Sequence, residues 1–160
     1  MAELAAIGIG SNLEQPNVQI DNALSALTQL PDTALVKTSP RYRSAPMGPS
    51  DQPDYVNAVA ILDTGLEPEI LLDRLQTIET AQGRVRNRRW GARTLDLDVL
   101  VFGDREIVTE RLVVPHPGIR ERAFVLVPLF DVLPALSIPG IGPIEALVTP
   151  GLRAQLEPLG

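Results

Sequence analysis

The sequence lacks cysteine altogether and contains one lysine, Lys37, among its 160 residues. The absence of cysteine excludes disulfide bonds and thiolate metal ligands, and it fits a cytoplasmic protein, which is the location we predict. No apolar run approaches the roughly 20 residues of a membrane-spanning helix. The first residues also lack the basic region of a signal peptide. We therefore expect no membrane association.

Aromatic residues are scarce as well, at 4%, and the net charge is -6. Both features argue against a broad nucleic-acid-binding surface, which would need positive charge and exposed rings. Hydrophobic residues make up 44% of the chain and charged residues 21%. This composition and length predict one globular domain over residues 1–160.

Positive charge is nevertheless concentrated in one short stretch of the chain. Residues 84–122 carry a net charge of +3, and five arginines lie within ten residues there: Arg84, Arg86, Arg88, Arg89 and Arg93. Guanidinium groups bind phosphate through paired hydrogen bonds. The cluster favours a small anionic ligand, with salt bridges to the acidic face of a neighbouring helix as the alternative.

The order of apolar patterns predicts a βαββαβ core, which is the ferredoxin-like α+β arrangement. We expect strands at residues 4–9, 34–42, 55–63 and 95–102, forming an antiparallel sheet with helices on one side. The helices should begin at Pro16 and Pro68, the second ending at Gly83. Additional C-terminal elements should include a helix over residues 119–130, interrupted by Pro128.

Two carboxylates occupy alternate positions of an otherwise apolar strand in RTLDLDVLVFG, residues 93–103. Side chains alternate between faces along a strand, so Asp96 and Asp98 should point the same way, with the flanking leucines directed into a core. Carboxylate oxygens are the ligands that Mg²⁺ prefers. Next to the arginine cluster, the pair indicates phosphoryl transfer. The alternative is a solvated face on which the aspartates have no ligand.

Three further features are weaker on their own. GIGSNL at residues 8–13 follows a strand but lacks the Lys-Ser/Thr of a Walker A motif, so it predicts a tight turn. Tyr55 and Asn57 share a strand face and could stack on and read a heterocycle, or simply belong to an ordinary strand. His116, the one histidine, stands in the restrained loop PHPG and could contact phosphate or remain exposed.

The stretch RWGARTLDLDVL, residues 89–100, resembles the signature of the hydroxymethyldihydropterin pyrophosphokinase family of folate biosynthesis. Further matching stretches are GSNL at 10–13, GPSDQPDYVNA at 48–58, IETAQGRVR at 78–86 and TERLVVPH at 109–116. The resemblance implies transfer of pyrophosphate from ATP to 6-hydroxymethyl-7,8-dihydropterin, giving the pterin diphosphate and AMP. It also implies ATP as co-substrate and two Mg²⁺ ions, and we expect a monomer whose partners are its two small-molecule substrates.

The resemblance assigns roles to individual residues. It implies that Asp96 and Asp98 hold the metal ions, and that Arg84 and Arg93 neutralise charge as the β-phosphorus is attacked. The residues implied to surround ATP are Gln76, Glu79, Arg86, Trp90, Arg111, His116 and Arg122. Those implied to bind the pterin are Ser44, Met47, Tyr55, Asn57 and Phe124.

Three other functions stay open at this point. A ferredoxin-like sheet could bind RNA, although the acidic charge and few aromatics disfavour it. The aspartates could serve a metal-dependent phosphohydrolase, but further acidic or histidine ligands are not found nearby in the sequence. An inactive scaffold is the third alternative, and the complete set of aspartates and arginines argues against it.

Overall fold

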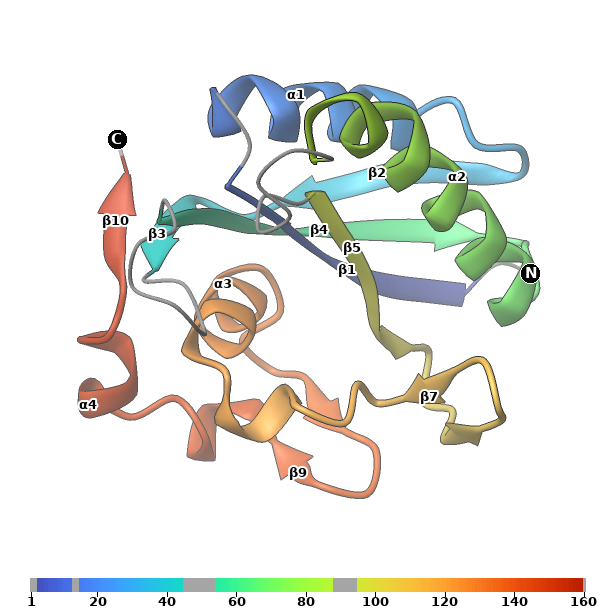
Figure 1. Cartoon of the computed structure of the whole chain (residues 1–160). Helices are drawn as coiled ribbons and strands as arrows, with labels where there is room; N and C mark the ends of the chain where they lie inside the picture. The colour runs from blue at the N-terminus through green and yellow to red at the C-terminus, as the bar shows by residue number, and fades with distance from the viewer. Residues whose placement is uncertain (1–2, 13–14, 45–53, 88–94, 160) are drawn as a thin grey trace.

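The computed structural model describes residues 3–12, 15–44, 54–87 and 95–159. Figure 1 shows a twisted antiparallel sheet with helices on both of its faces. The elements are, in chain order, β1 (Glu3–Ser11), α1 (Pro16–Leu27), β2 (Thr33–Thr38), β3 (Arg41–Ser44), β4 (Tyr55–Thr64), α2 (Pro68–Asn87), β5 (Leu95–Phe102), β6 (Ile107–Val108), β7 (Val113–Val114), the 3₁₀ helix η1 (Ile119–Glu121), α3 (Ala123–Val132), β8 (Ser137–Ile138), β9 (Gly142–Pro143), the 3₁₀ helix η2 (Ile144–Ala146), α4 (Pro150–Arg153) and β10 (Glu157–Leu159).

The main sheet has the strand order β10-β3-β4-β1-β5, and β2 pairs with β4 as well. The predicted ferredoxin-like core is confirmed, with β1 between β4 and β5 in antiparallel pairing. The strand predicted over residues 34–42 is two strands, β2 and β3, which both lie along β4. Pro40 explains the interruption, because proline cannot donate to a strand ladder. Ser39 bridges the gap by exchanging two hydrogen bonds of 2.8 Å with the backbone of Val59.

Helices α1 and α2 cover one face of the sheet, as predicted (Figure 1). Ile20, Ala23 and Leu27 form the buried stripe of α1, at the spacing expected of one helix face. The corresponding stripe of α2 includes Leu71 and Leu75, both with no exposed surface. These side chains form one apolar core with buried residues of β1 and β5, which are Ala5, Ile7, Ile9, Leu95, Leu97, Val99 and Phe102.

Helix α3 and the C-terminal elements cover the opposite face. Apolar residues surround α3 almost completely because the helix lies between the sheet and the η2–α4 segment. The predicted interruption at Pro128 is wrong, since α3 continues through it. The break comes earlier, at Arg122, whose extended backbone separates η1 from α3. Packing on both sides outweighs the hydrogen bond that Pro128 cannot make.

The observed ends of β1 and α2 also differ from the predicted ends. Strand β1 does not end at Ile9 but continues through Gly10 to Ser11, because β4 and β5 pair with it along that length. Helix α2 continues past Gly83 to Asn87, so it ends later than expected. Within the described ranges, no helix is long and apolar enough to cross a membrane.

Candidate active site

A pocket of about 140 Å³ lies on the α3 face of the sheet, where β1 ends and where β4 and β5 begin. Because these strand ends are neighbours in the sheet, side chains far apart in the sequence meet there. The residues that line the pocket are Gly8, Ile9, Gly10, Ser44, Tyr55, Asn57, Ala58, Asp96, Asp98, Arg122, Phe124 and Val125.

Gly8 and Gly10 of β1 line the pocket, and the tight turn predicted at residues 8–13 is wrong for both of them, because the strand continues to Ser11. A Cβ atom on Gly10 would lie 3.1 Å from Oδ1 of Asn57, and one on Gly8 would lie 3.2 Å from the Leu100 side chain. Any larger residue would therefore crowd the pocket. The signal available in the sequence was the period of two, which places both glycines on one face of the strand.

Asp96 and Asp98 lie on the pocket face of β5, directly opposite Gly10 and Gly8 of β1. Both aspartates are half-buried, whereas the alternating Leu95 and Leu97 are buried in the core on the other face. The predicted division of this strand is confirmed. Among the described residues, no group of three or more His, Cys, Asp or Glu side chains is placed to hold a metal ion. Two adjacent carboxylates nevertheless suit Mg²⁺, which commonly takes one or two carboxylates together with phosphate oxygens and water.

Glu79 of α2 reaches the same strand from the helix side. Its Oε2 atom accepts a hydrogen bond of 2.7 Å from the backbone N–H of Leu97, the residue between the two aspartates. Burial raises the pKa of the Glu79 carboxyl, and the charges of Asp96 and Asp98 raise it further. Strand β5 is the edge of the main sheet, so Glu79 satisfies an N–H group that has no neighbouring strand.

Asn57 and Ser44 form the polar wall of the pocket. The Asn57 side chain is 4% exposed, and its Nδ2 atom donates to Oγ of Ser44 at 2.8 Å. The hydrogen bond fixes the amide with its Oδ1 atom beside Gly10. Tyr55 from β4 and Phe124 from α3 supply aromatic rings to the same pocket. An oriented amide next to two rings is suited to a planar polar heterocycle.

Arg122 and His116 adjoin the aspartates. The Arg122 guanidinium carbon lies 5.8 Å from the centre of the Phe124 ring, within the range of a cation–π contact. Burial lowers the pKa of His116, which the negative charge of Asp98 opposes and the positive charge of Arg122 reinforces. Its Nδ1 atom accepts a hydrogen bond of 3.1 Å from the Gly118 N–H. The neutral ring therefore carries its proton on Nε2, where it can donate to an anion.

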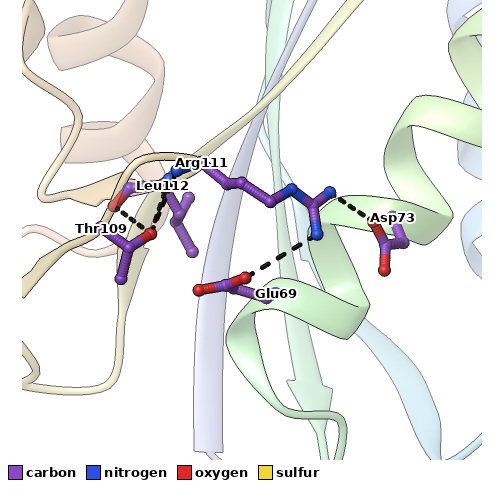
Figure 2. Close-up of polar contacts among 5 residues, drawn as sticks. All are labelled: Glu69, Asp73, Thr109, Arg111 and Leu112. Atoms are coloured by element: carbon purple, nitrogen blue, oxygen red, sulfur yellow. Dashed lines mark hydrogen bonds and ion pairs between the residues drawn. The ribbon is translucent and has the colours of Figure 1, made fainter.

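Arg111 and Gln76, two residues assigned to ATP, lie elsewhere. Figure 2 shows the Arg111 guanidinium between Asp73 and Glu69 on the first turns of α2. All three side chains are largely exposed, and such pairs stabilise a fold little, so Arg111 could exchange them for a phosphate at small cost. Gln76 is exposed on α2 and does not line the pocket.

Several assigned residues fall outside the described part of the chain. Met47, Trp90 and Arg93 belong to ranges that the structure does not describe. Arg84 and Arg86 belong to the last turns of α2, and their side chains are likewise outside the description. Their predicted roles stay predictions.

Fold and pocket together define a class, an α+β protein in which two carboxylates, an amide and two aromatic rings line one pocket. Residues 6–134 match the family model described as 7,8-dihydro-6-hydroxymethylpterin-pyrophosphokinase. The chain belongs to this family, as the resemblance in its sequence indicated.

Two curated relatives are both named 2-amino-4-hydroxy-6-hydroxymethyldihydropteridine pyrophosphokinase. The protein of Haemophilus influenzae is 54% identical over 144 residues, which covers 90% of each chain. The protein of Pseudomonas aeruginosa is also 54% identical, over 87% of this chain and 86% of its own.

Solved structures with much lower sequence identity support the fold. An HPPK-DHPS structure in complex with substrates has a TM-score of 0.72 and 13% identity over 91% of this chain. A Plasmodium falciparum HPPK-DHPS triple mutant also has a TM-score of 0.72, with 14% identity over 92% of this chain. This chain spans less than half of those two proteins, 42% and 43% of their length.

Proposed function

We propose that the pocket on the α3 face is where this chain transfers pyrophosphate from ATP to hydroxymethyldihydropterin, the reaction of its family in folate biosynthesis. The observation that supports this location is the meeting of Asp96 and Asp98 with Asn57 and two aromatic rings in one pocket. The hydroxyl oxygen of the pterin would form a bond to the β-phosphorus of ATP. The bond from that phosphorus to the bridging α–β oxygen would break, and AMP would leave.

In this proposal the pterin ring lies between Tyr55 and Phe124. Asn57 reads the amide-like edge of the ring, since its side chain offers both a donor and an acceptor. Ser44 orients Asn57 through their hydrogen bond and, with Met47, completes the pterin pocket. The glycines of β1 leave the space that the ring requires.

The phosphates of ATP would lie along Asp96 and Asp98, where two Mg²⁺ ions would neutralise their charge and polarise the reacting phosphorus. His116 donates from Nε2, and Arg122 adds a positive charge at the junction with the pterin pocket. Arg84 and Arg93 would stabilise the transition state. Gln76, Glu79, Arg86, Trp90 and Arg111 would hold the rest of the nucleotide.

We further propose that residues 1–160 work as one pterin pyrophosphokinase domain, as a cytoplasmic monomer whose partners are its two substrates. Family membership supports the substrates, and the composition supports the location.

Product analysis tests the proposed function. Protein, ATP, Mg²⁺ and hydroxymethyldihydropterin should yield AMP and a pterin diphosphate in equal amounts, with AMP formation dependent on the pterin. ADP with a pterin monophosphate would instead mean an ordinary kinase. Nucleotide hydrolysis without any pterin product would favour the phosphohydrolase.

A further inference from the structure

The segment from residue 149 to residue 159 lies beyond the residues that match the family model, which end at 134. It forms the short helix α4 and the strand β10, which is the outer strand of the main sheet beside β3 (Figure 1). Pro158 of β10 lies opposite Tyr42 of β3, and Glu157 lies opposite Arg43. Strand β3 is only four residues long, and its two neighbours in the sheet are β10 and β4.

A polar network fastens this segment to β3 and α3. The Tyr42 hydroxyl donates to Oδ2 of Asp131 on α3. Arg153 of α4 contributes an ion pair of 3.2 Å to Oδ1 of the same carboxylate and a longer contact of 3.5 Å to the Tyr42 oxygen. Burial raises the pKa of Tyr42, and Asp131 raises it further, so the phenol keeps the proton that it donates. The Asp131 carboxylate of α3 therefore contacts side chains of both β3 and α4.

An apolar cluster lies beneath the network. Tyr42, Ala123, Val127 and Leu156 are buried together, and Phe124 packs against them. Leu156 comes from the C-terminal segment, whereas Phe124 is a wall of the pocket. The C-terminal segment therefore supports the aromatic wall through packing as well as β3 through hydrogen bonds.

Strand β3 in turn builds the polar wall of the pocket. Tyr42 lies opposite Asn57 in the sheet, and its backbone oxygen accepts a long contact of 3.5 Å from Asn57 Nδ2. Two residues further on, Ser44 accepts the shorter hydrogen bond from the same amide. A shift of β3 would move both acceptors, and so turn the amide that faces the ligand.

We propose that the C-terminal segment is a positioning element for the pterin pocket, in which Arg153 acts through Asp131 and Tyr42 to hold β3 and the Ser44–Asn57 pair in place. The inference rests on the proposed function, because it assigns the pterin to this pocket. It predicts an effect on the pterin and not on the nucleotide, since the network touches β3 and α3 and not the aspartates of β5.

Equilibrium binding to the full-length chain tests this. The probes are 6-hydroxymethylpterin, in the presence of Mg²⁺ and α,β-methylene-ATP, and α,β-methylene-ATP alone. Arg153→Ala and Tyr42→Phe should each raise the Kd for the pterin about five-fold, the factor expected for one lost hydrogen bond. The Kd for the nucleotide should stay within about two-fold. Arg153→Lys, which keeps a cation for Asp131, should restore most of the pterin affinity.

Arg105→Ala is the matched control, because it removes an ion pair to Glu3 at the far end of the sheet. It should leave both dissociation constants unchanged. Tyr42→Phe removes a single oxygen atom and should fold, so the inference can be tested with this variant even if Arg153→Ala does not fold. Equal loss of pterin and nucleotide binding would overturn the inference by showing a general structural role. Unchanged pterin binding in both variants would also overturn it and leave the proposed function intact, whereas a wild-type chain that binds no pterin would overturn both.

Discussion

The two faces of the central sheet are built from the same strands but differ at every second residue. On the face under α1 and α2, β1 and β5 present buried apolar side chains, among them Ile7, Ile9 and Leu97. On the face under α3, the same strands present Gly8 and Gly10 opposite Asp98 and Asp96. One face is therefore closed by packing, and the other opens into a pocket at one end.

The difference shows how a short strand can serve stability and chemistry together. Because the side-chain period is two, the stretch LDLD directs Leu95 and Leu97 to the core and Asp96 and Asp98 to the pocket. Substitutions on the closed face should therefore change the free energy of unfolding, and those on the open face should change catalysis and binding.

Asp98→Ala should have the largest effect. In the proposed function this carboxylate would hold a cation that contributes several kcal/mol of charge stabilisation, so its removal should lower kcat more than about 100-fold. Steady-state kinetics with saturating ATP and Mg²⁺ measure this. Asp104→Ala, which removes an exposed carboxylate just beyond β5, is the control and should leave kcat unchanged. Near-normal turnover of Asp98→Ala would contradict the metal assignment.

Leu75→Ala probes the closed face. The side chain has no exposed surface, so its truncation should lower the free energy of unfolding by about 2 to 5 kcal/mol in urea titrations. Ile70→Ala on the same helix, where the side chain is 45% exposed, should cost less than about 0.5 kcal/mol. The KM for the pterin should not change in either variant while the protein is folded. A changed pterin KM in Leu75→Ala would mean that the two faces are not independent.

Gly10→Ala tests the floor of the pocket. The new Cβ would lie 3.1 Å from Asn57 Oδ1, and we expect the KM for the pterin to rise about ten-fold, as a misplaced methyl group in a binding pocket typically costs. Gly65→Ala is a matched control, because its Cβ would meet Asp32 Oδ2 at the same 3.1 Å, far from the pocket and on an exposed side chain. An equal effect of both substitutions would contradict the role of Gly10.

His116 gives the smallest expected effect, on the pH dependence of stability. Its pKa in the folded protein lies below the usual 6.5, so the unfolded chain takes up the proton first as the pH falls. The contribution of His116 is complete above about pH 6.5 and is lost as the pH falls below that value. Unfolding free energies of the wild type and of His116→Gln should therefore converge on acidification through this window. A constant difference between pH 8 and pH 5 would contradict the lowered pKa.

The core topology and the shared face of Asp96 and Asp98 could be predicted because both depend on local periodicity, whereas the pterin residues were implied by the family resemblance. Alternation placed Asp96 and Asp98 on one face, and four of the five predicted pterin residues line the pocket. The place of Gly8 and Gly10 in the pocket was not predicted. The space that a glycine leaves can be recognised only once its neighbours, here Asn57 and Leu100, are known. The positions of Arg111 and of the Glu79–Leu97 hydrogen bond depend on tertiary contacts, which no spacing in the sequence encodes.

The boundaries of elements were predicted least well, for the same reason. Gly83 and Pro128 are local signals for ending a helix, and α2 and α3 continue through both. For Pro128, the buried surroundings of α3 stabilise the helix by more than the local preference costs. The C-terminal contacts of Arg153 are likewise long-range, joining residues 22 and 111 positions apart in the chain.

A crystal structure of the chain with Mg²⁺, α,β-methylene-ATP and 6-hydroxymethylpterin would test the central claim most directly. The account predicts the pterin between Tyr55 and Phe124, with its amide edge on Asn57 and the triphosphate against Asp96 and Asp98. A pterin bound anywhere else, or a triphosphate held away from the two aspartates, would contradict it.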